Sequence, residues 1–269
     1  MLVDAHCHLE RATYGDEVDA VIERARRAGV GGLVAVGAGG ITEGAREAVA
    51  LAGRYAGIWA AVGIHPHDIH LANERDFAAI AELLAAPKVV ALGEVGLDYH
   101  YDRATGELQR AALARFCRLA EVHRQPLMLH VRDAYPDALK VLDDAGVPAA
   151  GAMVHCFTGG PAEAEAYLAR GLMLSIPGVV TFRNAAPLRE AVPLIPADRL
   201  LLETDSPYLA PVPHRGRRNE PALVAVTAAF VATLRGTSAE ALAAQTTANA
   251  RAFFGLPAGE QLTAPAAAG

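Results

Sequence analysis

Two histidines near the N-terminus, His6 and His8, are separated by a single residue. Residues two apart in a β-strand project from the same side, so both imidazoles can reach one cation while Cys7 points away. Such a pair binds a divalent metal ion in some proteins and is an ordinary pair of loop histidines in others. Taken alone, the pair leaves these two interpretations about equally open.

Further ionisable side chains follow short apolar runs elsewhere in the sequence. They are Glu94 after Val-Val-Ala-Leu-Gly, His130 after Pro-Leu-Met-Leu, His155 after Gly-Ala-Met-Val and Asp205 after Leu-Leu-Leu-Glu-Thr. A single histidine at a strand end is more often a satisfied, partly buried side chain than a metal ligand. All six groups together indicate a bound dication, because isolated charges leaving apolar strands would otherwise suffer uncompensated desolvation.

Four imidazoles and two carboxylates form a ligand set suited to a borderline-soft divalent ion. Zinc is the expected metal, with manganese, magnesium, cobalt or nickel as alternatives, although magnesium prefers oxygen ligands. Six ligands exceed what one catalytic zinc uses. Two metal ions ~3.5–4 Å apart, sharing a bridging carboxylate, would use all six and leave positions for water and substrate. We therefore expect two divalent cations per subunit.

The elements that must position these residues follow from hydrophobic periodicity. Short apolar runs alternate with longer segments of helical period, a pattern typical of βα units around a buried parallel sheet. The expected strands are 2–8, 32–37, 58–64, 89–94, 127–130, 152–155, 172–176 and 200–203. Eight strands within 269 residues predict a single (β/α)8 TIM barrel of the α/β class, with its active site at the C-terminal end of the strands.

Amphipathic segments between and after these strands predict the helices. They are 17–28, 42–54, 74–85, 105–123, 134–145, 222–234 and 239–254. Gly29, Gly146 and Gly171 stand where helix stops belong. We expect one barrel domain over residues 1–256 and an Ala/Pro-rich tail, 257–269, that is disordered or loosely packed.

Charge and cysteine content narrow the class of protein. The formal net charge of -6 argues against a broad basic surface for duplex nucleic acid, although it leaves room for a local basic patch. Three widely spaced cysteines do not suggest a disulfide framework, which favours a reducing compartment. The sequence shows no secretory signal and no apolar run of ~20 residues, so we expect a cytoplasmic protein with no membrane contact. No sequence feature indicates an obligate protein partner, and we expect none.

Seven blocks of sequence, in order over nearly the whole chain, carry a family pattern. They are VDAHCHL (3–9), GIHPH (63–67), GEVGLDY (93–99), PLMLHVR (126–132), HCFTG (155–159), LETDSPYL (202–209) and RGRRNEP (215–221). Together they resemble the TatD family of metal-dependent deoxyribonucleases, within the wider amidohydrolase-like barrel enzymes. Seven ordered blocks are specific, whereas any single one would be weak.

The resemblance implies a role for each candidate ligand. His6, His8 and Asp205 would bind one metal ion, His130 and His155 the second, and Glu94 would bridge them. Asp205 would also accept a proton from the attacking water, so Asp205 and Glu94 are the expected catalytic residues. This is chemically coherent, because a metal ion lowers the pKa of its water and a neighbouring carboxylate can accept the proton.

The residues expected to bind substrate are His65, Arg132, Glu203 and Arg215. The resemblance favours His65 near the scissile phosphate, with a turn held by Pro66 as an equal alternative for His65 and His67. Arg132 and Arg215 are candidates to hold phosphate oxygens, whereas Arg217 and Arg218 are expected to be solvated. Glu203 would face the same pocket, holding a further cation or a ligand's hydrogen bond.

Residues near the predicted rim have secondary expectations. Asn219 and Glu220 are expected to secure the loop after the eighth strand. Tyr208, Phe157 and Tyr99 are candidates to stack on an unpaired base, with core packing as the commoner role of aromatic residues.

The activity implied by the resemblance is hydrolysis of phosphodiester bonds in DNA by a metal-activated water, as a 3′-5′ exonuclease on single-stranded ends. An alternative keeps the metals and attacks an ester, amide or lactone bond, including deacylation of aminoacyl-tRNA. A non-catalytic metal-binding or scaffold protein is a third hypothesis, and the complete ligand set argues against it.

Overall fold

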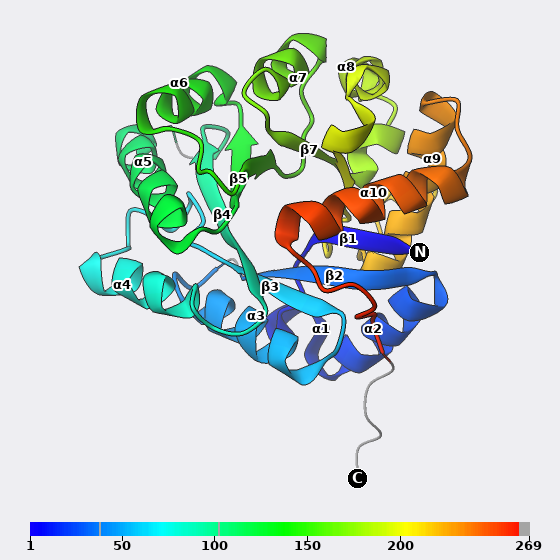
Figure 1. The fold of residues 1–269 in the computed structure, drawn as a ribbon, viewed down its shortest axis with the longest axis horizontal. Helices are drawn as coiled ribbons and strands as arrows, with labels where there is room; N and C mark the ends of the chain where they lie inside the picture. The colour runs from blue at the N-terminus through cyan, green and yellow to red at the C-terminus, as the bar shows by residue number, and fades with distance from the viewer. Residues whose placement is uncertain (38, 102, 264–269) are drawn as a thin grey trace.

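The computed structural model describes residues 1–37, 39–101 and 103–263. Its eight strands pair in parallel, in sequence order, within one sheet, and helices surround that sheet (Figure 1). The strands are β1 (Leu2–Cys7), β2 (Val30–Gly37), β3 (Ile58–Val62), β4 (Val89–Asp98), β5 (Leu127–Arg132), β6 (Ala152–Val154), β7 (Met173–Ile176) and β8 (Leu200–Leu202). This confirms the predicted (β/α)8 TIM barrel.

The main departure among the strands is the length of β4, which continues four residues beyond the expected end at Glu94. The extension pairs with β5, where Gly96 lies opposite His130 and Asp98 opposite Arg132. Gly96 has a φ of +148°, and any Cβ there would collide with the carbonyl oxygen of His130. Glycine at this position therefore allows β4 to run close beside β5 at the rim.

The helices match the expected segments to within two residues, with three short additions. They are α1 (Arg11–Tyr14), α2 (Val18–Arg27), α3 (Glu43–Arg54), α4 (Glu74–Leu83), α5 (Gly106–His123), α6 (Tyr135–Ala145), α7 (Pro161–Leu168), α8 (Ala186–Ala191), α9 (Val224–Leu234) and α10 (Ala239–Phe254). The additions α1, α7 and α8 are at most eight residues long, too short for a clear helical period. Gly29, Gly146 and Gly171 all have positive φ where the preceding helices end, as predicted.

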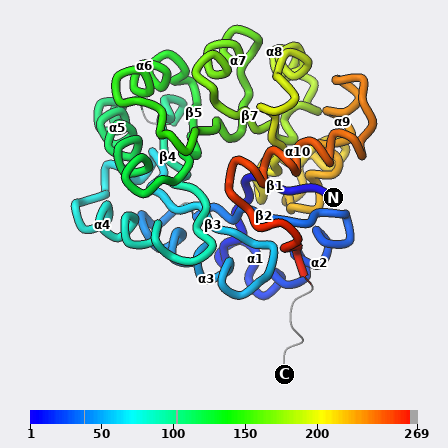
Figure 2. The backbone as a smooth tube through the Cα atoms, in the orientation of Figure 1, coloured from blue at the N-terminus to red at the C-terminus, as the bar shows by residue number. Residues whose placement is uncertain are grey.

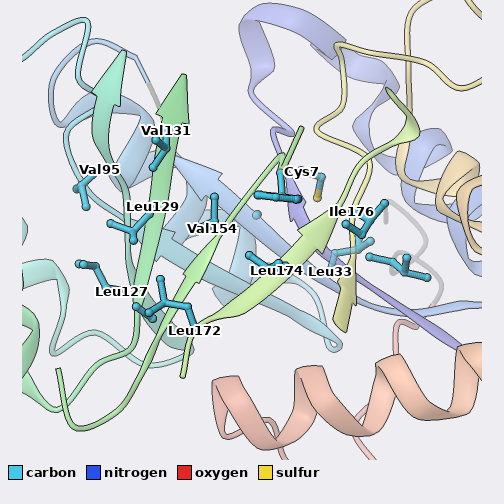
Figure 3. Close-up of a cluster of buried hydrophobic side chains, with 14 of the residues drawn as sticks. Cys7, Leu33, Val95, Leu127, Leu129, Val131, Val154, Leu172, Leu174 and Ile176 are labelled. Carbon is cyan, nitrogen blue, oxygen red and sulfur yellow. The ribbon is translucent and has the colours of Figure 1, made fainter. Parts of the chain in front are cut away.

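Apolar side chains form one cluster on each face of the sheet. The outer cluster lies between strands and helices, and Figure 3 shows Leu127, Leu129 and Val131 of β5 within it. Alternate residues, such as Met128, Met153 and Leu201, belong to the inner cluster. Because the side-chain period of a strand is two, the next positions on the inner face are His130, His155 and Glu203. The barrel interior is thus apolar below and ionisable at its C-terminal rim.

The N-terminal end of the barrel is covered by α10 and the residues that follow it. Helix α10 returns beside β1, where Thr247 Oγ1 donates a hydrogen bond to the carbonyl oxygen of Met1 at 2.8 Å (Figure 2). Phe254 and Leu256 join the inner apolar cluster. This closes the end of the barrel opposite the ionisable rim.

The described part of the predicted tail, residues 257–263, is mostly exposed, and two of its residues anchor it to the barrel. Leu262 is buried, and its backbone nitrogen donates to Gly31 O at 2.8 Å. Glu260 Oε1 lies 2.7 Å from Lys88 Nζ and accepts from Gly57 N at 3.1 Å. The remainder of the predicted tail, residues 264–269, lies outside the described residues.

In the described ranges, no single helix has the length and apolar character needed to cross a membrane. The pair Pro221–Leu234 and Ala239–Phe254 meets that criterion only when taken together, and its two helices are bent by 110°.

Candidate metal centre

Glu94 lies between two pairs of histidines at the C-terminal rim. Its Oε1 atom is 2.6 Å from His130 Nδ1 and 2.6 Å from His155 Nε2. Its Oε2 atom is 3.8 Å from His6 Nε2 and 3.9 Å from His8 Nε2. Each carboxylate oxygen therefore faces a different imidazole pair, the arrangement that a bridging ligand requires.

Asp205 completes the first of these groups. Its Oδ1 atom is 3.6 Å from His6 Nε2 and 3.5 Å from His8 Nε2. The ligand-type atoms of His6, His8 and Asp205 all lie within 4.8 Å of one another, close enough to hold one metal ion. All six candidate ligands predicted from the sequence are thus brought together at the rim.

The outer ring nitrogens of His6, His8 and His130 each lie within hydrogen-bond distance of an acceptor atom outside the group, whereas that of His155 lies near a carboxylate without forming a hydrogen bond. The pairs are His6 Nδ1 with Met128 Sδ (3.2 Å), His8 Nδ1 with Val36 O (3.1 Å), His130 Nε2 with Asp98 Oδ2 (3.1 Å) and His155 Nδ1 with Glu203 Oε1 (3.5 Å). In a neutral imidazole, an acceptor on the outer nitrogen holds the proton there, which leaves the inner nitrogen with a lone pair. In neutral rings that bind a metal ion, the lone pairs of His6, His8 and His130 would therefore point toward Glu94 and Asp205.

The inner nitrogens of the histidines lie close together in two pairs, as the ligands of a shared metal ion do. His6 Nε2 lies 3.1 Å from His8 Nε2, and His130 Nδ1 lies 3.2 Å from His155 Nε2. Two lone pairs at such distances repel unless a proton or cation is shared between them. Imidazole and carboxylate donors suit zinc and neighbouring transition ions. The donor set and its geometry therefore fit divalent metal ions.

The electrostatics of the group support an ionised carboxylate at its centre. Burial raises the pKa of Glu94, but the charge of His155 and the hydrogen bonds from His130 and His155 outweigh burial and hold that pKa well below its usual range. In the metal-free protein, the attraction between Glu94 and His155 also raises the pKa of His155. Burial lowers its pKa, whereas Glu94 and Glu203 raise it well above the ordinary value.

His65 and His67 leave β3 at the mouth of this group and have different environments. His65 Nδ1 accepts a hydrogen bond from the backbone nitrogen of His67 at 3.1 Å, so the proton of neutral His65 resides on Nε2. That atom lies 3.7 Å from Glu94 Oε1. Burial lowers the pKa of His65 to about 3. Although His65, Glu94 and His130 are close enough to hold a metal ion, His65 presents an N–H donor to the site rather than a lone pair.

Asp98 is a further candidate functional residue, for which the sequence predicted no role. The side chain is fully buried, and its Oδ2 atom lies 3.1 Å from His130 Nε2 and 2.8 Å from His67 Nε2. Its Oδ1 atom accepts hydrogen bonds from the backbone nitrogens of His100 and Tyr101 at 2.9 and 3.2 Å. Asp98 falls four residues after Glu94, on the same strand face, but the expected strand ended at Glu94 and assigned it no role.

Asp4, also without an assigned role in the sequence analysis, ties β1 to the exit of β8. Its carboxylate accepts from Thr204 N at 2.9 Å and from Thr204 Oγ1 at 2.6 Å. Burial raises the pKa of Asp4 to about 8. The neighbouring Glu203 is fully buried behind His155, and its Oε1 atom accepts from Cys156 N at 2.6 Å. In this position Glu203 is better placed to interact with the candidate metal ligand His155 than to contact the substrate directly.

The two arginines predicted to bind substrate are exposed at the rim. The Arg132 guanidinium lies over the Tyr101 ring, 4.8 Å from its centroid, and that of Arg215 lies over Phe182 at 4.4 Å. Neither forms an ion pair with any residue that the structure describes. By contrast, Arg218 is paired with Glu17. No described carboxylate neutralises the guanidinium charges of Arg132 and Arg215, so both can bind an anionic ligand.

The loop after β8 is secured as predicted. Asn219 Nδ2 donates to Thr204 O at 2.9 Å and to Tyr208 O at 2.6 Å. Glu220 accepts a bidentate hydrogen bond from Arg24, with a shortest distance of 2.6 Å. Both interactions hold the loop against the barrel wall, which confirms the structural role expected for Asn219 and Glu220.

Comparison with known proteins agrees with this site. Residues 3–255 match the family model described as TatD related DNase. The chain is 41% identical to "Uncharacterized metal-dependent hydrolase YabD" of Bacillus subtilis, over 94% of this chain and 99% of that protein. It is also 41% identical to "3'-5' ssDNA/RNA exonuclease TatD" of Erwinia billingiae, over 96% of this chain and 100% of that protein.

Solved structures give the same picture at the level of the fold. YJJV, a TatD homologue of Escherichia coli K12, superposes with a TM-score of 0.90 at 29% identity, covering 95% of this chain and 98% of that one. An organophosphorus hydrolase from Deinococcus radiodurans shares the fold at a TM-score of 0.60 and 18% identity, covering 94% and 92%. From the full-length family match and its close relatives, we conclude that the chain belongs to the TatD-related DNase family of metal-dependent hydrolases.

Proposed function

We propose that this enzyme hydrolyses phosphodiester bonds of DNA and acts as a 3′-5′ exonuclease on single-stranded ends. The observation that carries the proposal is the placement of Glu94, whose two oxygens face two separate imidazole pairs. A relative that is 41% identical is named a 3′-5′ ssDNA/RNA exonuclease, which supports this substrate class. A cytoplasmic location and the absence of an obligate protein partner belong to the same proposal.

The residues that would hold the metals form two sets around one carboxylate. His6, His8 and Asp205 would hold one divalent cation, His130 and His155 the other, and Glu94 would bridge them. Zinc is the first candidate because the set is dominated by imidazole nitrogens, with manganese, magnesium, cobalt and nickel as alternatives. Bound cations would supply Lewis acidity, lowering the pKa of a water molecule and drawing negative charge from a phosphoryl oxygen.

The chain's own residues would then divide the remaining work. Asp205, at the edge of the group, would accept the proton of the attacking water. His65 would donate a hydrogen bond from its Nε2–H group to a phosphoryl oxygen as negative charge develops there. Arg132 and Arg215 would bind backbone phosphates on either side of the scissile bond. Glu203 would hold the ring of His155 in place.

The test begins with protein stripped of metal by a chelator and reloaded separately with zinc, manganese, magnesium, cobalt or nickel. Single-stranded DNA labelled at its 3′ or 5′ end would be compared with duplex DNA, RNA, and a panel of esters, lactones, amides and aminoacyl-tRNA. We expect stepwise loss of nucleotides from the 3′ end of single-stranded DNA. Intact DNA with every metal, together with turnover of a carbonyl substrate, would show that the nuclease assignment is wrong.

A further inference from the structure

Tyr208 presents an exposed aromatic ring beside the candidate metal ligands. It follows Asp205 by three residues, and 60% of its surface is exposed. The ring centroid lies 6.1 Å from that of His8, with an angle of 69° between the ring planes. The two rings meet edge to face and are not stacked. The Tyr208 hydroxyl makes no hydrogen bond to any residue that the structure describes.

The backbone that carries this ring is held firmly on both sides. Tyr208 N donates to Asp205 O at 2.9 Å, and Tyr208 O accepts from the buried Asn219 side chain at 2.6 Å. The next carbonyl, of Leu209, packs so closely on Gly178 that a Cβ there would come within 2.8 Å of it. Because the backbone is already held, a ligand that stacks on the ring has to order only the side-chain rotamer of Tyr208, which limits the loss of conformational entropy.

A second exposed tyrosine at the rim, Tyr101, differs in what covers its ring. Tyr101 is 66% exposed, but the Arg132 guanidinium lies over its face at 4.8 Å. The rings of His67 and His100 contact it edge-on, at centroid distances of 5.2 and 4.8 Å. Within the described ranges, Tyr208 carries neither a cation nor a stacked ring on its face. Of the two tyrosines, Tyr208 is the one with a face open to a planar ligand.

We propose that Tyr208 is a stacking platform for the unpaired base of the nucleotide next to the scissile phosphate. The inference rests on the proposed nuclease function, because it takes its substrate from that site. Base stacking on an aromatic side chain tolerates every base, since each base has a π-face. A base inside a duplex is already stacked and paired, so a platform this close to the metal ligands favours frayed or single-stranded ends.

The first experiment compares steady-state cleavage of a single-stranded oligonucleotide by four proteins: wild type, Tyr208→Leu, Tyr208→Phe and Val212→Ala. Tyr208→Leu keeps an apolar side chain but removes the ring, and we expect KM to rise about 5-fold or more with a smaller change in kcat. Tyr208→Phe keeps the ring and should restore the wild-type KM. Val212, 45% exposed in the same loop, provides the matched control for disturbance of the loop.

The second experiment identifies the base by removing bases from the substrate. An abasic residue is placed in turn at each of the last few positions of the strand. With wild type, one position should raise KM as much as Tyr208→Leu does. With Tyr208→Leu, the same base removal should cause no additional rise, because both changes delete one contact. Additive effects at every position, or a wild-type KM for Tyr208→Leu, would overturn the platform.

A binding measurement separates stacking from catalysis. In an Asp205→Asn background, an oligonucleotide with 2-aminopurine at the identified position should lose fluorescence when it binds, and Tyr208→Leu should abolish that loss. Suppose that wild type cleaves DNA, and that Tyr208→Leu matches it both in cleavage and in the loss of 2-aminopurine fluorescence. In that case only the Tyr208 inference fails. If wild type cleaves no DNA with any metal, the proposed function fails and the platform fails with it.

Discussion

The backbone nitrogen of Asp205 donates a hydrogen bond to the carbonyl oxygen of His6 across 3.0 Å. A second bond, from His8 N to Ser206 O at 2.8 Å, lies directly beside it. These bonds join the exit of β8 to the exit of β1, where the barrel closes. The contact between these two strand exits therefore also fixes the backbones of His6, His8 and Asp205 relative to one another.

Because the hydrogen bond to His6 holds the backbone of Asp205, the Asp205 side chain can be changed without disturbing that backbone. Asp205→Asn keeps the shape and the backbone hydrogen bond to His6 but removes the charge that would bind metal and accept a proton. We expect kcat for DNA to fall on the order of 10³-fold while the melting temperature stays close to that of wild type. Asp198→Asn, which alters a carboxylate that is 69% exposed near the start of β8, is the control. Substantial activity in Asp205→Asn would remove Asp205 from the catalytic role.

Asp98 provides a test of how His130 is oriented. Because Asp98 faces His130 Nε2, Asp98→Asn weakens the interaction that holds the His130 lone pair toward Glu94. We expect zinc affinity to fall about 10-fold, measured by competition with a chelator of known affinity. Asp133→Asn is the matched control, since Asp133 is 66% exposed on the same rim and pairs with His100. Equal zinc affinity in the two variants would show that Asp98 does not orient a ligand.

Metal binding should release protons and strengthen as pH rises. In the metal-free protein, burial lowers the pKa of His8, but the hydrogen bond to Asp205 and the charge of Glu94 outweigh it and raise the pKa to about 9. A proton therefore competes with the metal below that pH, and the competition fades as pH approaches 9. Calorimetric titration with metal at pH 6.5, 7.5 and 8.5, in two buffers of different ionisation enthalpy, counts the protons released.

His100→Gln provides the control for this titration, because His100 is a half-exposed histidine on the same rim that faces Asp133 rather than the candidate ligands. The variant should release the same number of protons as wild type. A metal affinity independent of pH, with no proton release, would contradict the ligand assignment of His8.

A substitution at the N-terminal end of the barrel should lower stability without changing metal affinity at the opposite end. Leu262 is buried at the end opposite the candidate metal centre, and its backbone is bonded to Gly31. Leu262→Ala should lower the free energy of unfolding by about 2 kcal/mol, measured by urea denaturation, with metal affinity unchanged. Leu194→Ala, at a site that is 61% exposed, should change stability little. A stability loss as small as that of Leu194→Ala would show that residues 257–263 contribute little to the fold.

The sequence by itself determined the barrel and the identity of the candidate ligands. Strand and helix periods are local properties, so the alternating pattern predicted eight strands and placed His130, His155 and Asp205 at strand exits. Ligand chemistry is also local, because imidazoles and carboxylates keep their donor character wherever the chain carries them. The resemblance to a known family then rested on short blocks whose order could be read directly.

Only the tertiary structure decided how these groups face one another. The register of β4 against β5 shifts between Leu92 and Val95, and that of β1 against β2 shifts between Asp4 and Cys7. Such shifts depend on pairing between distant segments, so no local pattern predicts them. Beyond the first of these shifts, β4 pairs with β5 as far as Asp98, and Glu94 lies between the two imidazole pairs. Residue types follow from the chain, whereas the direction of each proton and lone pair follows from the neighbours that folding supplies.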